Sequence, residues 1–565
     1  MSLKSHPIPM IPKTTRHVAQ AVFPQPAPAM RFRDEFEGFL QQLDFAALYP
    51  VRGKPALPPW RLLLVTILQF SENLTDREAA HAVKARLDWK YALSLDLKDP
   101  GFHYSVLSEF RDRLLKQENL LAYLDVFLQC CKDKGLLKTR GKQRTDSTHV
   151  LAQLRVMNRY ELVAETLRAV LNTLATHYPE WIRDYIPKHW YEKYAHRFEN
   201  YRLPKKEWDR ADFLRRVGMD GYYMLCALEQ DSAKEILQKQ FSEVEAFQHI
   251  WKRHFRRTSR GVELIPSDEL PPARLGVESP YESEAKYSTK RGKEWVGYKV
   301  HYTETCDEDL PHLIVHIDTT TAEANDAPRL ELIHQALQKR ALLPAQHWVD
   351  AGYVSAEQLC QSQNQYGIGL IGPPRGTRKW QKGPDDRFDL RDFRVLWDEE
   401  KVICPSGSTS ISWKAQTSKQ RGPSILAKFR GQECLGCALR KKCTTSTRGK
   451  QLVFLPRDRQ EALFEARDLL NSEEGKKLYQ LRAGVESVFS QGVRAFGLRK
   501  SRYRGLAKTH QQNIFVALAM NYSRLEDWFA GNRPQPTRIS ALTRAQPIRV
   551  KQARRKTNLA PEAHL

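Results

Sequence analysis

A strand–helix–strand unit near the middle of the chain constrains the fold more than any other feature of the sequence. The apolar run His347–Val349 is followed by Asp350-Ala351-Gly352-Tyr353, by a helix that Ser355 caps with Gln358, and by the strand Ile368–Ile371. Strands joined through a helix in this way belong to one sheet. Ligands of such units gather at the carboxyl ends of the strands, which is where Asp350 stands. The unit predicts an α/β protein.

Further strands and helices extend this core on both sides. Lys142–Val150 has strand character, and Trp295–Tyr302 and Leu313–Thr319 are expected to pair as a hairpin across the polar loop Asp307–Asp309. Helices are expected at Ala327–Gln338, Ser472–Phe496 and Gln511–Trp528.

The periodicity also divides the chain into blocks. We expect a Pro-rich extension (1–30), a helical block (31–136), the first core strand (137–153), a helical insertion (154–275), the core continued (276–386), a cysteine-bearing insertion (387–455), the C-terminal core helices (456–529) and a basic tail (530–565). In the first helical block, Thr75 and Glu78 form a capping box. Short helices in a basic protein favour a helix-turn-helix type DNA-binding domain, and a purely structural all-α domain is an equal alternative.

The charge balance indicates the class of partner. The 565 residues include 90 Lys and Arg against 66 Asp and Glu, which gives a formal net charge of +24. Nucleic acid is the default polyanion for such a chain, and an acidic membrane surface is the rival. No stretch approaches the roughly 18 apolar residues of a spanning helix, and prolines interrupt the first thirty residues, where a signal peptide would begin. We therefore expect a cytoplasmic protein.

Three acidic residues stand out by their surroundings. Asp146 lies in the strand-like RTDSTHV, Asp350 follows a strand, and Glu486 lies on the late helix. Carboxylates that converge from two strands and a helix are suitable ligands for two Mg²⁺ ions, which can promote phosphodiester cleavage. For each Asp alone, a turn or cap role is the more common explanation.

The late helix adds basic and aromatic side chains to Glu486. Tyr479, Arg482 and Glu486 have offsets of 0, 3 and 7, so a continuous helix presents them on one face. An ordinary ion pair between Arg482 and Glu486 is the structural alternative. The segment beyond them predicts a basic DNA groove, with Phe496 and Tyr503 interleaved for stacking and positive charge from Arg494, Arg499, Lys500, Arg502, Arg504 and Lys508.

Together these motifs resemble the DDE transposases of bacterial insertion sequences, and within that superfamily the 1182-type enzymes. The resemblance rests on Asp146-Ser147-Thr148, on Asp350-Ala351-Gly352-Tyr353, and on Tyr479-x2-Arg482-x3-Glu486 followed by GVRAFGLRKSRYRGLAKTH, and extends from near Phe32 to about Trp528.

The resemblance implies an RNase H-like catalytic core with Asp146, Asp350 and Glu486 as the Mg²⁺ (or Mn²⁺) triad. It also implies that Tyr479 and Arg482 handle the transposon-end DNA, and that the protein works at the bacterial nucleoid. The family signature ends in a Lys six residues after the Glu. Here that position is Val493, and its neighbour Arg494 is the candidate replacement.

The implied activity is Mg²⁺-dependent nicking at the terminal inverted repeats, followed by attack of the freed 3′-hydroxyl on target DNA. The partners would be transposon ends and target, both double-stranded DNA, bound by a homodimer or higher oligomer. Two alternatives remain: a DNA-binding protein that has lost catalysis, and a Mg²⁺ nuclease that does not transfer strands.

Four of the nine cysteines are clustered, at Cys404, Cys434, Cys437 and Cys443. A pair spaced by two residues, with two more Cys within about forty residues, is suited to a structural Zn²⁺ in a small zinc-ribbon-like insertion. Unligated thiols are the alternative. The remaining five are expected to be buried apolar residues, namely Cys130, Cys131, Cys226, Cys306 and Cys360.

Several other residues have plain structural explanations. His149 is interpreted as a satisfied strand histidine rather than a metal ligand. Asp326 is interpreted as a helix cap. The tail holds eight Arg and Lys against one Glu, and is either a solvated DNA contact or simply disordered. No phosphate-binding glycine loop supports use of ATP.

Overall fold

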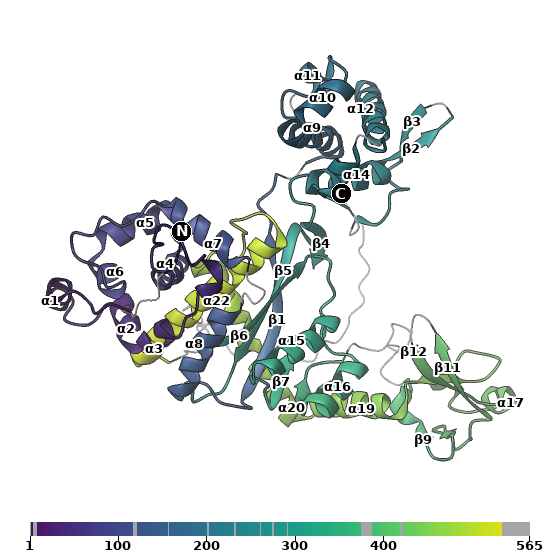
Figure 1. Ribbon diagram of the computed structural model, residues 1–565. Helices are drawn as coiled ribbons and strands as arrows, with labels where there is room; N and C mark the ends of the chain where they lie inside the picture. Colours follow the sequence, from purple (N-terminus) through teal and green to yellow (C-terminus); the bar gives the residue numbers. More distant parts are fainter. Residues whose placement is uncertain are drawn as a thin grey trace, which may run out of the picture.

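A computed structural model describes residues 2–3, 8–116, 121–155, 157–199, 203–230, 233–259, 261–273, 276–290, 292–374, 387–418 and 422–533. Figure 1 shows a central mixed sheet with N-terminal helices on one side, a helical lobe above it and a small β-rich lobe beyond α19. The basic tail predicted at 530–565 lies outside the described residues from 534 onward.

The central sheet has six strands. Its order is β4-β5-β1-β7-β8, and β6 also pairs with β5. β1 is antiparallel to β5 and parallel to β7, and β7 is parallel to β8. The strands are β1 (Lys142–Leu151), β4 (Lys286–Lys290), β5 (Lys293–Thr305), β6 (Ile314–Thr321), β7 (Gln346–Val349) and β8 (Gly369–Ile371). The predicted α/β class and the β5–β6 hairpin are confirmed.

The strand–helix–strand unit forms as the sequence predicts. α15 (Ala327–Lys339) leads into β7, and α16 (Ala356–Tyr366) connects β7 to β8. The Ser355 side chain accepts a hydrogen bond from the Gln358 backbone N–H, which satisfies one free donor at the start of α16. Asp326 was expected to cap α15 with its side chain, and this is wrong. Asp326 makes no cap hydrogen bond and instead forms an ion pair with Lys299 at 2.9 Å.

The N-terminal helices pack on α22 (Leu506–Phe529), the last helix of the described residues, as Figure 1 shows. The other side of α22 faces β6, so this helix is buried along most of its length. The capping box of Thr75 and Glu78 forms with both hydrogen bonds. The N-terminal helices are α1 (Lys13–Val22), α2 (Pro28–Glu35), α3 (Glu37–Gln41), α4 (Pro59–Ser71), α5 (Asp76–Ala85), α6 (Leu87–Ala92), α7 (Ser105–Leu114) and α8 (Ala122–Asp133).

A helical lobe between β1 and β4 has a hydrophobic core of its own. Large apolar side chains such as Leu167, Phe247 and Trp251 fill it, and every buried member of the cluster lies between residues 162 and 277. Its elements are α9 (Arg159–His177), α10 (Pro179–Tyr185), α11 (Trp190–Lys193), α12 (Glu207–Leu228), α13 (Lys234–Gln238), α14 (Ser242–His254), β2 (Phe255–Thr258) and β3 (Gly261–Leu264).

The β-rich lobe also packs around a small separate core, which includes Phe393, Phe429 and Phe454. It contains the pair β9 (Arg394–Leu396) and β10 (Lys401–Ile403), the sheet of β11 (Ser412–Ser418), β12 (Gly422–Lys428) and β13 (Gln451–Phe454), and the short helices α17 (Gly431–Leu435) and α18 (Arg440–Cys443).

The late helix differs from its sequence prediction. After α19 (Arg457–Asn471), the predicted helix Ser472–Phe496 is divided into α20 (Glu473–Gln480), the 3₁₀ turn η7 (Leu481–Ala483) and α21 (Gly484–Ala495). The Arg144 guanidinium donates to the Leu481 carbonyl at 2.7 Å, which provides a partner for a carbonyl at the break. No helix in the described part of the chain is long and apolar enough to cross a membrane.

Candidate active site

The two aspartates of the predicted triad lie at matching positions of neighbouring strands, Asp146 within β1 and Asp350 directly after β7. In the parallel pairing of β1 with β7, Thr145 lies opposite Val349, and the next residues are Asp146 and Asp350. Each carboxylate accepts a hydrogen bond of 2.7 Å from the backbone N–H that follows it, in Ser147 and Ala351 respectively. The sheet register therefore brings these two acids together.

Glu486 comes to the same place from the first turn of α21, and all three carboxylates meet at Arg482. The Arg482 Nη2 lies 2.6 Å from Asp146 Oδ2 and 3.7 Å from Asp350 Oδ2, and its Nη1 lies 3.7 Å from Glu486 Oε1. The three acids are exposed to very different degrees, with side-chain exposure of 12% for Asp146, 37% for Asp350 and 73% for Glu486. One guanidinium is thus shared by three carboxylates at the edge of the sheet.

Burial and charge act against each other at this site. Burial raises the pKa of Asp146, while Arg482 and the Ser147 N–H hold it down by favouring the ionised form. Burial alone would lower the pKa of the Arg482 guanidinium, yet the pKa is raised because Asp146 and Asp350 stabilise its charge. Burial also raises the pKa of Tyr479, one turn before Arg482. Burial and the neighbouring charges therefore oppose each other at both Asp146 and Arg482.

A cavity of about 390 Å³ opens beside the carboxylates, with Asp146, Glu486 and Arg494 in its wall. Val493, at the position of the signature Lys, lines it next to exposed Arg494. A second cavity of about 890 Å³ shares Val493 and Arg499 with the first and reaches Asn73 and Tyr104 of the N-terminal helices. The two cavities therefore adjoin at Val493 and Arg499, and the N-terminal helices help to enclose the larger one.

The basic segment after α21 is only partly available to a ligand. Arg499 donates to Thr148 and to His149 of β1, and Arg502 donates to Leu74 O and Asn73 Oδ1. Lys508 forms an ion pair with Asp112 at 2.9 Å. Lys500 and Arg504 are exposed. Part of the predicted groove charge therefore joins elements of the protein to each other.

The stacking role predicted for Phe496 is wrong, because its ring is only 3% exposed and belongs to the hydrophobic core. The Tyr503 ring, which partly lines the larger cavity, already carries the Arg111 guanidinium over its face. The interpretation of His149 as a satisfied strand histidine agrees with its contacts, since Arg499 donates to its ring and Trp295 lies beside it. Burial lowers the pKa of His149 to about 4, so the ring is neutral.

The donor chemistry of the three acids suits a hard cation, since all the convergent atoms are carboxylate oxygens. As the side chains stand, however, the described ranges hold no group of three or more His, Cys, Asp or Glu arranged to bind a metal ion. Arg482 supplies the positive charge in their midst.

Comparison with protein families gives two matches on this chain. Residues 403–526 match the family model described as "Transposase DDE domain", a span that includes Tyr479, Arg482 and Glu486. Residues 18–113, in the N-terminal helices, match the model described as "Transposase domain (DUF772)". These two segments are therefore similar to parts of transposases. A search of curated proteins finds no significant match to the chain.

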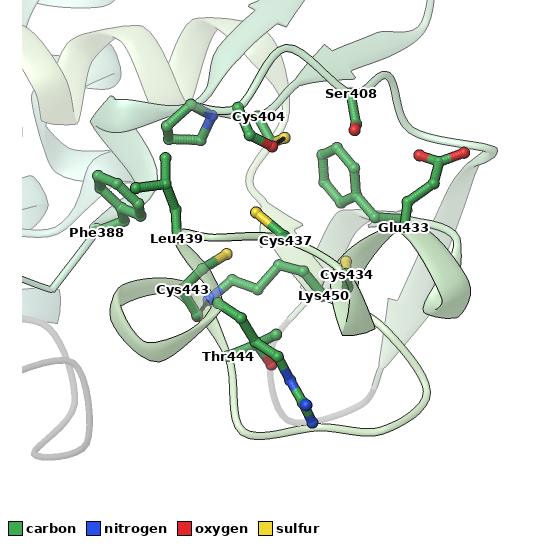
Figure 2. Close-up of a pocket in the computed structure, with 14 residues that line it drawn as sticks. Phe388, Cys404, Ser408, Glu433, Cys434, Cys437, Leu439, Cys443, Thr444 and Lys450 are labelled. Carbon is green, nitrogen blue, oxygen red and sulfur yellow. Dashed lines mark hydrogen bonds between the residues drawn. The ribbon is translucent and has the colours of Figure 1, made fainter.

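The segment that matches the transposase DDE domain also includes the four clustered cysteines. Figure 2 shows Cys404, Cys434, Cys437 and Cys443 around one pocket, together with Lys450. Burial raises the pKa of the Cys443 thiol, and the neighbouring Cys434, Cys404 and Cys437 raise it further while Lys450 opposes them. The sequence cluster is thus also a cluster in space, although no metal-binding arrangement occurs in the part of the chain that the structure describes.

The other cysteines largely follow expectation. Cys130, Cys131 and Cys306 are buried and Cys360 is partly buried. Cys226 is exposed on α12, so the prediction that it is buried is wrong.

The sequence prediction missed two sets of residues around the three acids. Lys290 and Lys293 are exposed at the tip of the β4–β5 hairpin. The charge of Lys290 lowers the pKa of Asp146, and the charges of both lysines lower the pKa of His149. Tyr353 is fully buried below Asp350, and its hydroxyl bonds to His301 Nδ1 at 2.6 Å. The sequence signal for Lys290 and Lys293 is a basic hairpin that precedes a long strand. Nothing in the sequence pairs Tyr353 with His301.

Proposed function

We propose that this protein is a DDE transposase that binds the terminal inverted repeats of its own insertion sequence and catalyses Mg²⁺-dependent cleavage and strand transfer. Asp146, Asp350 and Glu486 would hold the Mg²⁺ or Mn²⁺ ions. The observation that carries the proposal is the meeting of these three carboxylates, from two adjacent strands and a helix, around one positive charge. Bound metal ions in such a site would activate water and stabilise the leaving oxygen.

The strand order supports the further proposal of an RNase H-like core of the 1182-type transposases. A long antiparallel pair, β5 and β6, borders β1, and the parallel strands β7 and β8 follow on the other side. The two aspartates then lie on adjacent central strands and the glutamate on a later helix, the order that the family resemblance implies.

The protein's own side chains would hold the DNA around this centre. Arg482 and Arg494 are close enough to the acids to bind a scissile phosphate, and Tyr479 packs one turn before Arg482. Lys500 and Arg504 are exposed for further backbone contacts, and the N-terminal helices would recognise the repeat sequence. Because two ends must be joined, a homodimer or higher oligomer would act on the DNA at the bacterial nucleoid.

The test is incubation of the full chain with duplexes bearing the element's terminal repeats, a supercoiled target and Mg²⁺. We expect nicks at the repeat ends and joining of the 3′-ends to the target. Asp350→Asn should reduce cleavage by at least about 10³-fold, since it removes a metal ligand at constant side-chain shape. Asp468→Asn, an exposed acid that pairs with Arg391 and not with Arg482, is the matched control and should cleave normally.

The outcomes separate the alternatives. Binding of the repeats without any cleavage would favour a catalytically inactive DNA-binding protein. Cleavage without joining would favour a Mg²⁺ nuclease. Equal activity of wild type and Asp350→Asn would show that the assigned acids are not the catalytic ones.

We also propose that the four-cysteine pocket binds a structural Zn²⁺ ion in a zinc-ribbon-like insertion. The pocket has a volume of about 20 Å³, room for a single water-sized atom, and four thiols line it. The sulfurs would close by a small movement onto the ion, and Lys450 would offset part of the thiolate charge.

Metal analysis of protein purified without chelator tests this site. We expect about one Zn²⁺ per chain, lost in Cys437→Ser and retained in Cys226→Ser, an exposed cysteine outside the pocket. Less than about half an equivalent of Zn²⁺ in the wild type would overturn the assignment.

A further inference from the structure

Arg482 occupies the centre of the proposed metal site and contacts all three carboxylates. Its two terminal nitrogens are divided among Asp146, Asp350 and Glu486, at 2.6 to 3.7 Å. The side chain is only 16% exposed, and in the described structure its buried Nε has no hydrogen-bond partner. The guanidinium is thus held by charge, with one donor left unsatisfied.

The backbone places this side chain at a joint. Arg482 is the middle residue of the 3₁₀ turn η7, between α20 and α21. Short 3₁₀ segments within a helix often mark hinges. The preceding residue is fixed by Arg144, and the following glycine, Gly484, packs directly on the Arg144 guanidinium. The turn is held from β1, so the side chain of Arg482 can change partners without a shift of the whole helix.

We propose that Arg482 is a stand-in cation that holds the three carboxylates together before metal binds, and leaves them for a DNA phosphate when metal arrives. The inference rests on the proposed function, since it takes the three acids to be the metal ligands. Its new content is that one positioning residue couples metal binding to DNA binding.

The physical reason is competition between positive charges. A guanidinium 2.6 Å from Asp146 Oδ2 takes a lone pair that a metal ion would need, and repels a divalent cation at that distance. A DNA phosphate offers Arg482 an equivalent bidentate partner close by. Each ligand then removes an obstacle to the other, so the coupling must be reciprocal.

The test is titration of the DNA-free full chain with Mn²⁺, by calorimetry, for wild type and Arg482→Gln. We expect the variant to bind Mn²⁺ about tenfold more tightly, because the competing charge is gone. In EDTA its melting temperature should be lower than that of the wild type, since three carboxylates then repel one another, and Mn²⁺ should raise it by more. Arg482→Ala repeats the measurement if the Gln variant folds poorly.

Arg183→Gln is the control. It removes one positive charge at an exposed position of α10, in the helical lobe. Its Mn²⁺ affinity should change by less than about twofold, because an exposed charge is screened. A duplex carrying the terminal repeats should raise the Mn²⁺ affinity of the wild type and leave that of Arg482→Gln nearly unchanged.

Two failures can be told apart. Equal Mn²⁺ affinity of wild type and Arg482→Gln, with binding abolished by Asp146→Asn, would overturn the stand-in role and leave the proposed function intact. Mn²⁺ binding that survives unchanged in Asp146→Asn and in Asp350→Asn would show that the acids are not the metal site, and the proposed function would fail with it.

Discussion

At the scale of single residues, the sequence does not show whether a basic side chain contacts another part of the protein or is available to a ligand. Arg502 and Arg504 are two residues apart in the basic segment, and both were candidates for DNA contact. The guanidinium of Arg502 bridges Leu74 O and Asn73 Oδ1, at 2.7 and 2.5 Å, and covers the Phe70 ring. Arg504 is exposed beside Tyr281. The first arginine joins the N-terminal helices to the core, and the second is available to a ligand.

We therefore expect opposite phenotypes from two otherwise similar substitutions. Arg502→Gln should lower the free energy of unfolding by about 1–3 kcal/mol, because it removes hydrogen bonds to a charged group at a domain contact. Arg504→Gln should leave stability unchanged and reduce the salt dependence of repeat binding by about one phosphate contact. Urea unfolding and fluorescence anisotropy at several salt concentrations measure the two effects. A stable Arg502→Gln that loses salt dependence would contradict this division.

At the scale of elements, the bend between α20 and α21 depends on a glycine packed against an arginine. A Cβ at Gly484 would lie 1.8 Å from Arg144 Nη1. That guanidinium cannot easily move, since it is buried and bonded to Glu304 at 2.6 Å and to Leu481 O at 2.7 Å. Glycine is therefore required here although the backbone is helical.

Gly484→Ala should destabilise the protein by about 1–3 kcal/mol, although alanine is the better helix former, because the clash outweighs helix propensity. Gly38→Ala is the control: Gly38 is also helical, and nothing lies within 4 Å of the added methyl. It should be neutral or raise stability by up to about 1 kcal/mol. Thermal unfolding of both variants checks the pair, and equal effects would mean that Arg144 yields readily.

The same element shows what sequence periodicity can and cannot supply. Strands and helices of the core follow the predicted order, because alternation and capping are local signals, as at Ser355 and Thr75. The two aspartates stand out because each lies in or directly after a strand-like run, whereas Glu486 stands out through its helical spacing from Tyr479 and Arg482. The break at η7 could not be predicted, since its cause is a side chain on β1 that lies 337 positions earlier.

At the scale of the whole molecule, the domains are tied together by buried polar groups that carry no sequence signature. Asn521 of α22 exchanges two hydrogen bonds with Ile314 of β6, and Gln511 donates to Arg111 O of α7. Buried histidines also join the sheet to a helix, since His334 of α15 and His347 of β7 bond to each other at 2.9 Å. Composition alone could not show that these histidines are inside.

Buried histidines make the folded state sensitive to acid. Burial lowers the pKa of His301 and His334 to about 4 and that of His316 to about 3. Between these values and the unfolded value of about 6.5 the unfolded chain binds more protons, so stability must fall as pH falls through this window. We expect the free energy of unfolding to be constant above about pH 7.5 and to decline steadily from pH 6.5 to pH 4.

A single histidine should account for a measurable share of that decline. His334→Gln loses its bond to His347 and should be less stable by about 1 kcal/mol at pH 8. Below pH 6.5 the stability of this variant should fall less steeply than that of the wild type, by up to about 3 kcal/mol over the window. The reason is that the unfolded variant has one histidine fewer that can take up a proton. His81→Gln, at an exposed position, should keep the wild-type slope. Parallel slopes for wild type and His334→Gln would mean that carboxylates, and not the buried histidines, set the acid limit of the fold.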